Sequence, residues 1–390
     1  MIKHCNLFLL LIFSLSVSAQ KGMNTTKTVT SNMYSYDTTR IYDVMAKARR
    51  GEEITLGFIG GSITKGFAAS SDSKRWINLV TNWWKTTFPK AKINMINAGI
   101  GGTGSNIGAF RVKEDLLSHQ PDFVVVEFAV NDSLNDLSTQ TMEGLVRQIL
   151  QDPRHPALMM LCLREEKGKT AQKYHIPVAR HYRIPLISFA DLIEAQVAKD
   201  GVSLHSLFSD GLHPLDPGMK YIAQFINDEL SRIYHKLPPD NEMSVVKTKL
   251  PNPLTTELFA NTTKYNSTTL IAKSNNGWNK SPDSWTAETP GSEITFEVKG
   301  SAIAILYSRY NTVNRGMAEV WLDNGKHILL NAHWNDTWGP AIIFKMIGEF
   351  LESDKHTLHI KIVKETDEWS NGHFFQLLNV LSAEKTNVKK

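Results

Sequence analysis

The residues best suited to chemistry are a serine, an aspartate and a histidine that lie far apart in the chain. Ser62 stands in the small-residue segment Gly60-Gly-Ser-Ile-Thr64, directly after a short apolar run. Such a turn lets a serine hydroxyl and its backbone N–H face the same space. In Asp210-Gly-Leu-His-Pro214, two residues separate an aspartate from a histidine. This spacing permits the Asp210 carboxylate to accept Nδ1–H of His213, which leaves Nε2 to take a serine proton.

Two further segments carry groups that stabilise negative charge. The glycines of Asn97-Ala-Gly-Ile-Gly-Gly-Thr-Gly-Ser105 let a backbone amide approach a substrate closely. The same segment contains a GxGxxG pattern that begins at Gly99, but it follows the second predicted strand rather than the first, which disfavours a dinucleotide site. Phe128-Ala-Val-Asn-Asp132 ends the third predicted strand, where the Asn131 side chain can direct an N–H at an oxyanion.

Short apolar runs alternate with amphipathic stretches as far as about residue 235. The runs predict strands at residues 54–59, 93–98, 123–128, 157–163 and 186–188. The stretches between them predict helices at residues 76–88, 107–117, 142–150, 171–181 and 190–199. This order predicts an α/β domain at residues 20–240, with a parallel sheet covered by helices on both faces. Active sites of such sheets lie at the carboxyl ends of the strands.

The pattern changes after a proline-containing connection, which we predict to be a linker at residues 241–254. Beyond it, alternating apolar and polar residues predict strands at residues 293–298, 303–307, 318–322 and 357–362. Asp323-Asn-Gly325 predicts a hairpin. Residues 255–390 are therefore predicted to form an all-β sandwich, which could bind carbohydrate.

Four side chains outside the central motifs invite an interpretation. Trp321 alternates within a predicted strand and is expected in the core of the sandwich. Trp334 and Trp338 lie in a polar, glycine-containing segment and are candidates for stacking on sugar rings. Arg111 is a candidate for orienting a substrate, although an i,i+4 ion pair with Asp115 on a helix surface is the favoured interpretation.

The first twenty residues have the features of an export signal. Lys3 and His4 precede an apolar segment at residues 7–17, and Val17-Ser-Ala19 is an AxA-like cleavage site. We predict a signal peptide at residues 1–19, and secretion to the medium, the periplasm or the cell surface. Since a membrane span needs about 20 apolar residues, no stable membrane span is expected.

Composition argues against several classes of partner. The 43 basic and 39 acidic residues give a net charge of +4 without a basic block, so nucleic acid is not an expected partner. Cys5 lies in the predicted signal, which leaves Cys162 without a disulfide partner and favours a buried, inert thiol. The chain has no HExxH motif and no tight carboxylate cluster, so we expect neither metal nor cofactor.

In their order along the chain, the four motif segments resemble the four sequence blocks of the SGNH (GDSL-like) hydrolases. The resemblance covers residues 54 to about 230 and implies a three-layer, doubly wound, flavodoxin-like parallel sheet. The site residues that it implies are a catalytic set of Ser62, Asp210 and His213, with an oxyanion hole formed by Ser62 N–H, Gly102 N–H and the Asn131 side chain.

Two positions depart from the family pattern. Gly61 replaces the aspartate of the Gly-Asp-Ser-Leu form, and Ala129 stands where the third block usually has glycine. Neither change removes a reacting group. The Gly-Gly-Ser-Ile-Thr form is similar to that of carbohydrate O-acetyl esterases within the family, which implies a secreted serine esterase acting on acylated carbohydrate. The α/β-hydrolase alternative is disfavoured because the final glycine of GxSxG is missing.

Two other functions remain open from the sequence. One is a secreted carbohydrate-binding or adhesion protein whose hydrolase domain is inactive. The other is a lipase-type esterase of the same family, since preference for an acetyl group rests on the resemblance alone.

Overall fold

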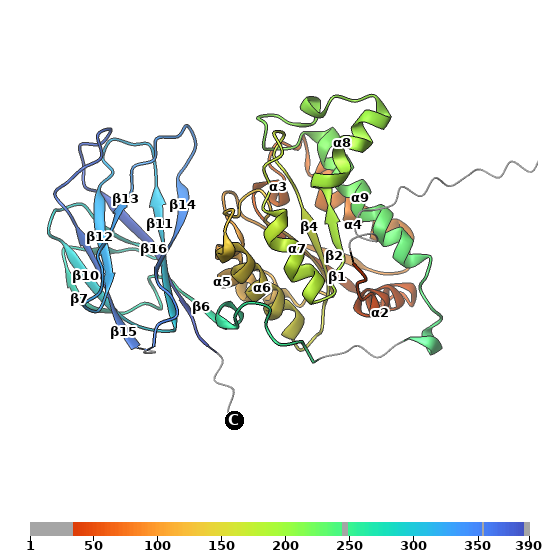
Figure 1. Ribbon diagram of the computed structural model, residues 1–390, viewed down its shortest axis with the longest axis horizontal. Helices are drawn as coiled ribbons and strands as arrows, with labels where there is room; N and C mark the ends of the chain where they lie inside the picture. Colours follow the sequence, from red (N-terminus) through yellow and green to blue (C-terminus); the bar gives the residue numbers. More distant parts are fainter. Residues whose placement is uncertain (1–33, 244–248, 353–354, 386–390) are drawn as a thin grey trace, which may run out of the picture.

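The structure is a computed structural model that describes residues 34–243, 249–352 and 355–385. An α/β part and a C-terminal β part lie side by side (Figure 1). The predicted signal peptide at residues 1–19 lies outside the described residues. In the described ranges, no helix has the length and apolar character needed to cross a membrane.

Five parallel strands form the sheet of the α/β part, in the order β2-β1-β3-β4-β5. Each predicted strand is present, with ends within one residue of the prediction. The strands are β1 (Ile54–Gly60), β2 (Ile93–Gly99), β3 (Phe123–Glu127), β4 (Ala157–Cys162) and β5 (Leu186–Ser188).

Helices cover both faces of this sheet. The helices are α2 (Thr39–Arg49), α3 (Ser62–Lys65), α4 (Trp76–Thr87), α5 (Ser105–Asp115), α6 (Asp136–Gln151), α7 (Gln172–His181), α8 (Phe189–Asp200) and α9 (Asp216–Tyr234). Phe123 and Val125 of β3 join the core formed with α2, α4, α8 and α9, whereas Val124 and Val126 join the core formed with α5, α6 and α7. Because both faces of the strand are buried, its sequence is continuously apolar. The predicted three-layer α/β fold is confirmed.

The C-terminal part is all-β, as predicted. Its antiparallel sheets have the strand orders β13-β12-β15-β10-β7 and β14-β11-β16-β9-β8, and β6 also pairs with β16. The strands are β6 (Thr262–Tyr265), β7 (Ala272–Asn276), β8 (Asn279–Lys280), β9 (Trp285–Ala287), β10 (Glu293–Lys299), β11 (Ala302–Arg309), β12 (Met317–Leu322), β13 (Ile328–Asn331), β14 (Ala341–Gly348), β15 (Lys355–Ile362) and β16 (Phe375–Ala383). The predicted hairpin joins β12 to β13.

The prediction that Trp321 lies in the core is wrong. In β12, Val320 and Leu322 are the buried residues, and successive side chains of a strand point to opposite faces. Trp321 therefore faces away from the core. Its ring is stacked between His327 and His359, with ring centroids 4.1 Å and 4.7 Å away.

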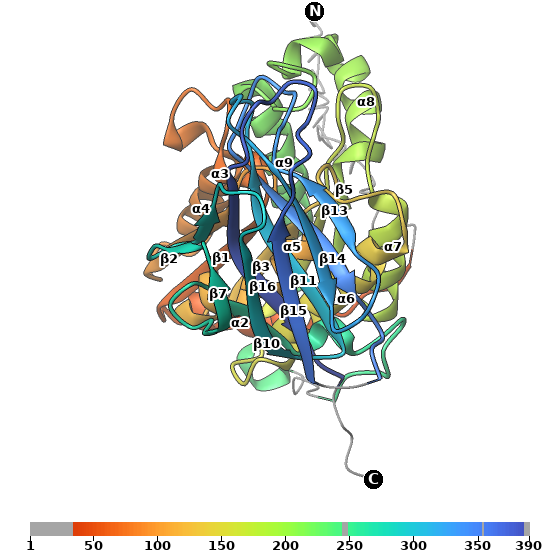
Figure 2. The same ribbon diagram turned by 90° about the vertical axis from the view of Figure 1, so that its left-hand side faces the viewer.

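One sheet of the β part packs on the helices of the α/β part. Apolar residues of β11 and β16 belong to the same core as α5 and α6. The ring of Phe110 on α5 lies 6.3 Å from that of Phe344 on β14. Figure 2, viewed from the side of the β part, shows its strands in front of these helices. The two parts therefore share an apolar interface.

Glu127, the last residue of β3, is a buried acid. Burial raises the pKa of its carboxyl to about 8, while the hydrogen bond from Thr64 Oγ1 acts in the opposite direction and the nearby Asp132 adds to the increase. A carboxyl with this pKa is mostly protonated at neutral pH. The end of β3 therefore carries a neutral acid.

Because Glu127 is buried, we predict that the free energy of unfolding of the protein falls as the pH rises. Because the folded-state pKa of Glu127 is raised, its contribution to stability is fully present below the ordinary value of 4.5 and is lost as the pH rises to about 8. Gln cannot ionise, so the free energy of unfolding of Glu127→Gln should decrease less than that of wild type over this range. Urea denaturation at both ends of the range measures the difference. An equal decrease in the two proteins would contradict the assignment.

Candidate active site

Three of the motif segments follow the neighbouring strands β1, β2 and β3 and lie at one edge of the sheet. In the register of the sheet, Gly60 of β1 pairs with Gly99 of β2 on one side and with Glu127 of β3 on the other. The segments that follow these strands therefore start at the same level. They contain Ser62 and Asn131 together with the glycine run that begins after β2.

Ser62 is the first residue of the short helix α3, and Gly61 before it is extended. The space at Gly61 is closed, because a Cβ atom there would lie 2.2 Å from Asn131 Oδ1. Gly61 thus lets the chain pass the Asn131 side chain just before it presents Ser62. A larger residue at position 61 would therefore displace the Asn131 side chain.

Ser62, His213 and Asp210 form one hydrogen-bonded row. Ser62 Oγ lies 2.8 Å from His213 Nε2, and His213 Nδ1 lies 2.7 Å from Asp210 Oδ2. The other oxygen of Asp210 accepts the backbone N–H groups of Leu212 and His213. Gly211, with a φ of 79°, completes this turn. The turn holds the aspartate and the histidine ring in a fixed relation.

The same contacts keep Asp210 ionised. Partial burial works toward a higher pKa, but the hydrogen bonds from the His213 ring and from the N–H groups of His213 and Leu212 outweigh it. The pKa of Asp210 therefore lies below its ordinary value. An ionised carboxylate on Nδ1 orients the ring and stabilises the imidazolium that forms when Nε2 takes a proton.

The glycine loop after β2 borders the serine. A Cβ atom on Gly101 would lie 3.8 Å from Ser62 Cβ, so the two residues are close neighbours. Gly102 has a φ of 70°, a conformation that favours glycine. On the opposite side, Asn131 is adjacent to Gly61 through its Oδ1 atom. The predicted oxyanion residues thus lie on segments that flank the serine.

A buried Asp132–His175 pair holds the end of the glycine loop at Ser105. His175 Nε2 lies 2.8 Å from Asp132 Oδ2, and Asp132 Oδ1 accepts the N–H of Ser105 at 2.6 Å. Cys162, buried and free as predicted, lies 4.0 Å from the other nitrogen of His175. Sequence reasoning missed His175, since a single histidine within an amphipathic helix carries no distinguishing signal.

Arg111 does not take the position that a substrate-orienting residue would need. Its side chain is only 2% exposed and donates to the backbone oxygens of Gly60 and Ala98. It also pairs with Asp115 at 3.0 Å, as the sequence favoured, but this pair lies mostly inside the protein rather than on a helix surface. Arg111 thus ties together the ends of β1 and β2.

Trp338 brings the β part to this edge of the α/β sheet. A Cβ atom on Gly102 would lie 3.4 Å from the Trp338 ring, so the ring borders the glycine loop. Trp338 is 49% exposed and makes an edge-to-face contact with Trp334 at 5.3 Å. The guanidinium of Arg309 lies 4.8 Å from the centre of the Trp334 ring. An exposed aromatic face therefore stands beside the predicted oxyanion loop.

The row of Ser62, His213 and Asp210 places a hydroxyl, an imidazole and a carboxylate at hydrogen-bonding distance. This is the arrangement that acyl transfer through a serine requires. Among the residues that the structure describes, no group of three or more His, Cys, Asp or Glu side chains is arranged to hold a metal ion.

Comparison with known proteins supports this chemistry. Residues 58–221 match the GDSL-like Lipase/Acylhydrolase family. The chain is 27% identical over 208 residues to thioesterase 1/protease 1/lysophospholipase L1 of Escherichia coli (strain K12). The aligned region covers 51% of this chain and 94% of that protein. The chain is 24% identical over 161 residues to an arylesterase of Vibrio mimicus, which covers 38% of this chain and 78% of the arylesterase.

Solved structures extend the similarity to the β part. A two-domain esterase active on acetylated mannans, co-crystallized with mannopentaose, is 30% identical with a TM-score of 0.80, over 90% of this chain and 96% of that one. A second structure of a two-domain esterase active on acetylated mannans is 29% identical with a TM-score of 0.81, over 90% and 97% of the two chains. The chain therefore belongs to the GDSL-like lipase/acylhydrolase family and is an esterase or acylhydrolase.

Proposed function

We propose that this chain is an exported serine esterase that removes O-acetyl groups from polysaccharides. The observation that carries the proposal is the 2.8 Å contact between Ser62 Oγ and His213 Nε2. On the other side of the ring, His213 Nδ1 lies 2.7 Å from Asp210 Oδ2. A nucleophile and a base at this distance can exchange a proton without rearrangement. Export is proposed from the signal features of residues 1–19.

The reaction proceeds by acyl transfer in two halves. His213 Nε2 takes the Ser62 proton as the oxygen attacks the acetyl carbonyl, and the resulting imidazolium gives this proton to the departing sugar oxygen. This step leaves an acetyl-Ser62 ester. Water then attacks the ester and His213 takes one of its protons. Acetic acid leaves as this proton returns to Ser62, and the acid ionises to acetate in solution.

The negative charge of each tetrahedral intermediate needs hydrogen-bond donors at a fixed position. We assign this role to the N–H groups of Ser62 and Gly102 and to the side-chain N–H of Asn131. The position of Asn131 supports the assignment, because its side chain lies next to Gly61, the residue before Ser62.

Carbohydrate is the proposed alcohol component because of Trp338. Its exposed ring borders Gly102 and offers an apolar face beside a polar site, which suits the apolar face of a sugar ring. The two-domain relatives active on acetylated mannans cover both parts of the chain, which makes acetylated mannan the first substrate to test.

Release of acetate from acetylated mannan tests the proposal. Wild type should release acetate, while Ser62→Ala should lose nearly all activity because the nucleophile is absent. Activity in Ser62→Ala equal to that of wild type would place the chemistry elsewhere. If wild type binds the glycan without releasing acetate, the alternative of a carbohydrate-binding protein is favoured. Faster hydrolysis of long-chain than of acetyl esters would favour the lipase-type alternative.

The proposed oxyanion role of Asn131 has its own test. Asn131→Ala removes one donor, and loss of one such donor typically lowers kcat by about 10²- to 10³-fold. KM should change much less, because the donor acts mainly on the intermediate. Steady-state kinetics on 4-nitrophenyl acetate measures both constants. A kcat within about threefold of wild type would exclude this role for Asn131, since the expected loss is far larger.

A further inference from the structure

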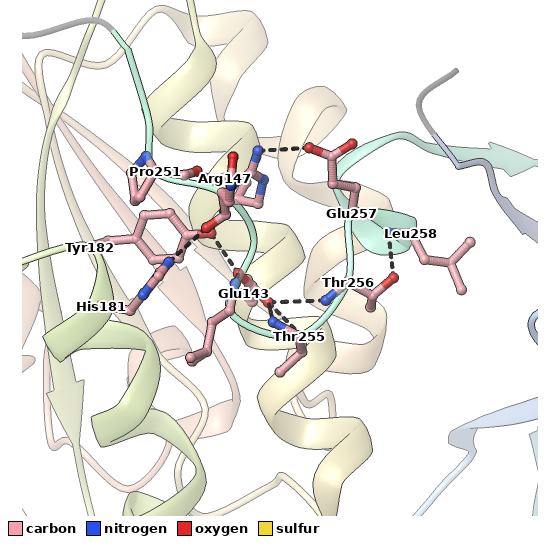
Figure 3. Close-up of polar contacts among 11 residues, drawn as sticks. Glu143, Arg147, His181, Tyr182, Pro251, Thr255, Thr256, Glu257 and Leu258 are labelled. Atoms are coloured by element: carbon pink, nitrogen blue, oxygen red, sulfur yellow. Dashed lines mark hydrogen bonds and ion pairs between the residues drawn. The ribbon is translucent and has the colours of Figure 1, made fainter. Parts of the chain in front are cut away.

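Helix α6 carries two buried charged residues that the proposed chemistry does not use. Glu143 and Arg147 lie one turn apart and are 0% and 5% exposed. Both face the segment of residues 250–257, which leads from the α/β part to the β part (Figure 3). Because buried charges are costly unless they are paired and hydrogen-bonded, the partners of these residues indicate their role.

The carboxylate of Glu143 binds consecutive N–H groups of this segment. Its Oε2 accepts the N–H of Thr255 at 2.7 Å, the N–H of Thr256 at 3.4 Å and the Thr255 hydroxyl at 2.5 Å. Its Oε1 accepts the N–H of Leu254 and the hydroxyl of Tyr182. Burial raises the pKa of Tyr182, and its bond to Glu143 adds to this, so the phenol remains a donor.

Arg147 binds both ends of the same segment. It donates to Pro251 O at 3.0 Å and to Glu257 Oε1 at 3.2 Å, and it also donates to the Tyr182 hydroxyl at 2.8 Å (Figure 3). We refer to Glu143, Arg147 and Tyr182 as the linker clamp. The clamp binds the backbone of the connection between the two parts at several residues.

Neighbouring residues of α6 hold the chain where it enters the β part. Gln148 Nε2 donates to Phe259 O and to Ala109 O of α5, both at 2.8 Å. Gly144 lets the chain cross the helix closely, because a Cβ atom there would lie 2.3 Å from Phe259 Cβ. One helix thus holds both the linker and the first residues of the β part.

The same helix also touches the segment that carries the glycine loop. Thr141 Oγ1 of α6 lies 2.7 Å from Ser105 Oγ, at the start of α5 and just after the loop that contains Gly102. Trp338 borders Gly102 from the other part of the molecule. The relative position of Trp338 and Gly102 therefore depends on how the β part is held against α5 and α6.

From these contacts we infer that the linker clamp positions the β part so that Trp338 completes the substrate site beside Gly102. This inference rests on the proposed function, since contact with a sugar is what makes the position of Trp338 matter. Glu143 and Arg147 act as positioning residues through the linker. They affect esters that reach Trp338 and spare those too small to do so.

Glu143→Gln is the principal test. It preserves the size of the side chain but places an NH₂ group against backbone donors. Since small displacements at a site can cost up to about 100-fold in rate, we expect kcat/KM on acetylated mannan to fall by about tenfold. On 4-nitrophenyl acetate it should change by less than about twofold, because this ester is too small to need the β part.

A double variant separates positioning from stability. Trp338→Ala should lower kcat/KM on acetylated mannan, and adding Glu143→Gln should then cause little further loss, because the residue that the clamp positions is gone. Effects that multiply in the double variant would contradict the inference. Thr255→Val, which removes one hydroxyl contact with Glu143, is the milder replacement if Glu143→Gln does not fold.

Glu229→Gln is the matched control. Glu229 is a buried carboxylate on α9 that pairs with Arg232 and Tyr36, away from the linker. Its loss should lower the melting temperature while leaving the ratio of activities on the two esters unchanged. A change in this ratio equal to that of Glu143→Gln would show that any buried carboxylate has the same effect, and the inference would fail.

Hydrogen exchange measures the clamp without any glycan. In Glu143→Gln, the amides of residues 249–257 and 331–340 should exchange faster than in wild type, and in Glu229→Gln they should not. Unchanged exchange in Glu143→Gln would overturn the inference, whatever the substrate. Absence of acetate release by wild type, with faster exchange in Glu143→Gln, would instead overturn the proposed function and leave the clamp in place.

Discussion

The hydrogen bond between Ser62 and His213 is the constraint on which the rest of the structure depends, because it joins groups separated by 151 residues. Each side of this bond is supported independently. On the serine side, Gly61 leaves room for Asn131, and Arg111 binds the carbonyl of Gly60 directly before the turn. On the histidine side, the turn that begins at Asp210 supplies three hydrogen bonds within four residues. The parallel sheet positions the serine side, and the turn before α9 brings the histidine to it.

Much of the α/β part could be predicted from sequence because its strands are buried on both faces and its helices are amphipathic. The β part was less predictable: β14, β16 and the short strands β6 to β9 were not anticipated, since their patterns depend on which face meets another element. Trp321 shows the same difficulty, because alternation within a strand identifies two faces without telling which one is interior. The proposed catalytic and oxyanion residues could be named from four motifs, whereas His175 and the linker clamp could not. Their partners lie on distant segments, and only the fold brings them together.

The β part reaches the edge of the α/β sheet that carries Ser62 through a loop rather than through its sheets. Its apolar face lies on α5 and α6, and the loop between β13 and β14 places Trp338 beside Gly102. Helix α6 is central to this arrangement, since it contacts the linker, the entry to the β part and the start of α5.

Covalent trapping tests the central claim most directly. A phosphonate or phosphate ester with a good leaving group, such as diethyl 4-nitrophenyl phosphate, reacts fastest with an activated oxygen nucleophile and leaves a stable adduct. Peptide mass spectrometry after incubation should find one adduct per chain, on Ser62, and the rate of its formation should fall steeply in His213→Ala. An intact Ser62 peptide in a fully folded protein, or an adduct on a different serine, would contradict the account.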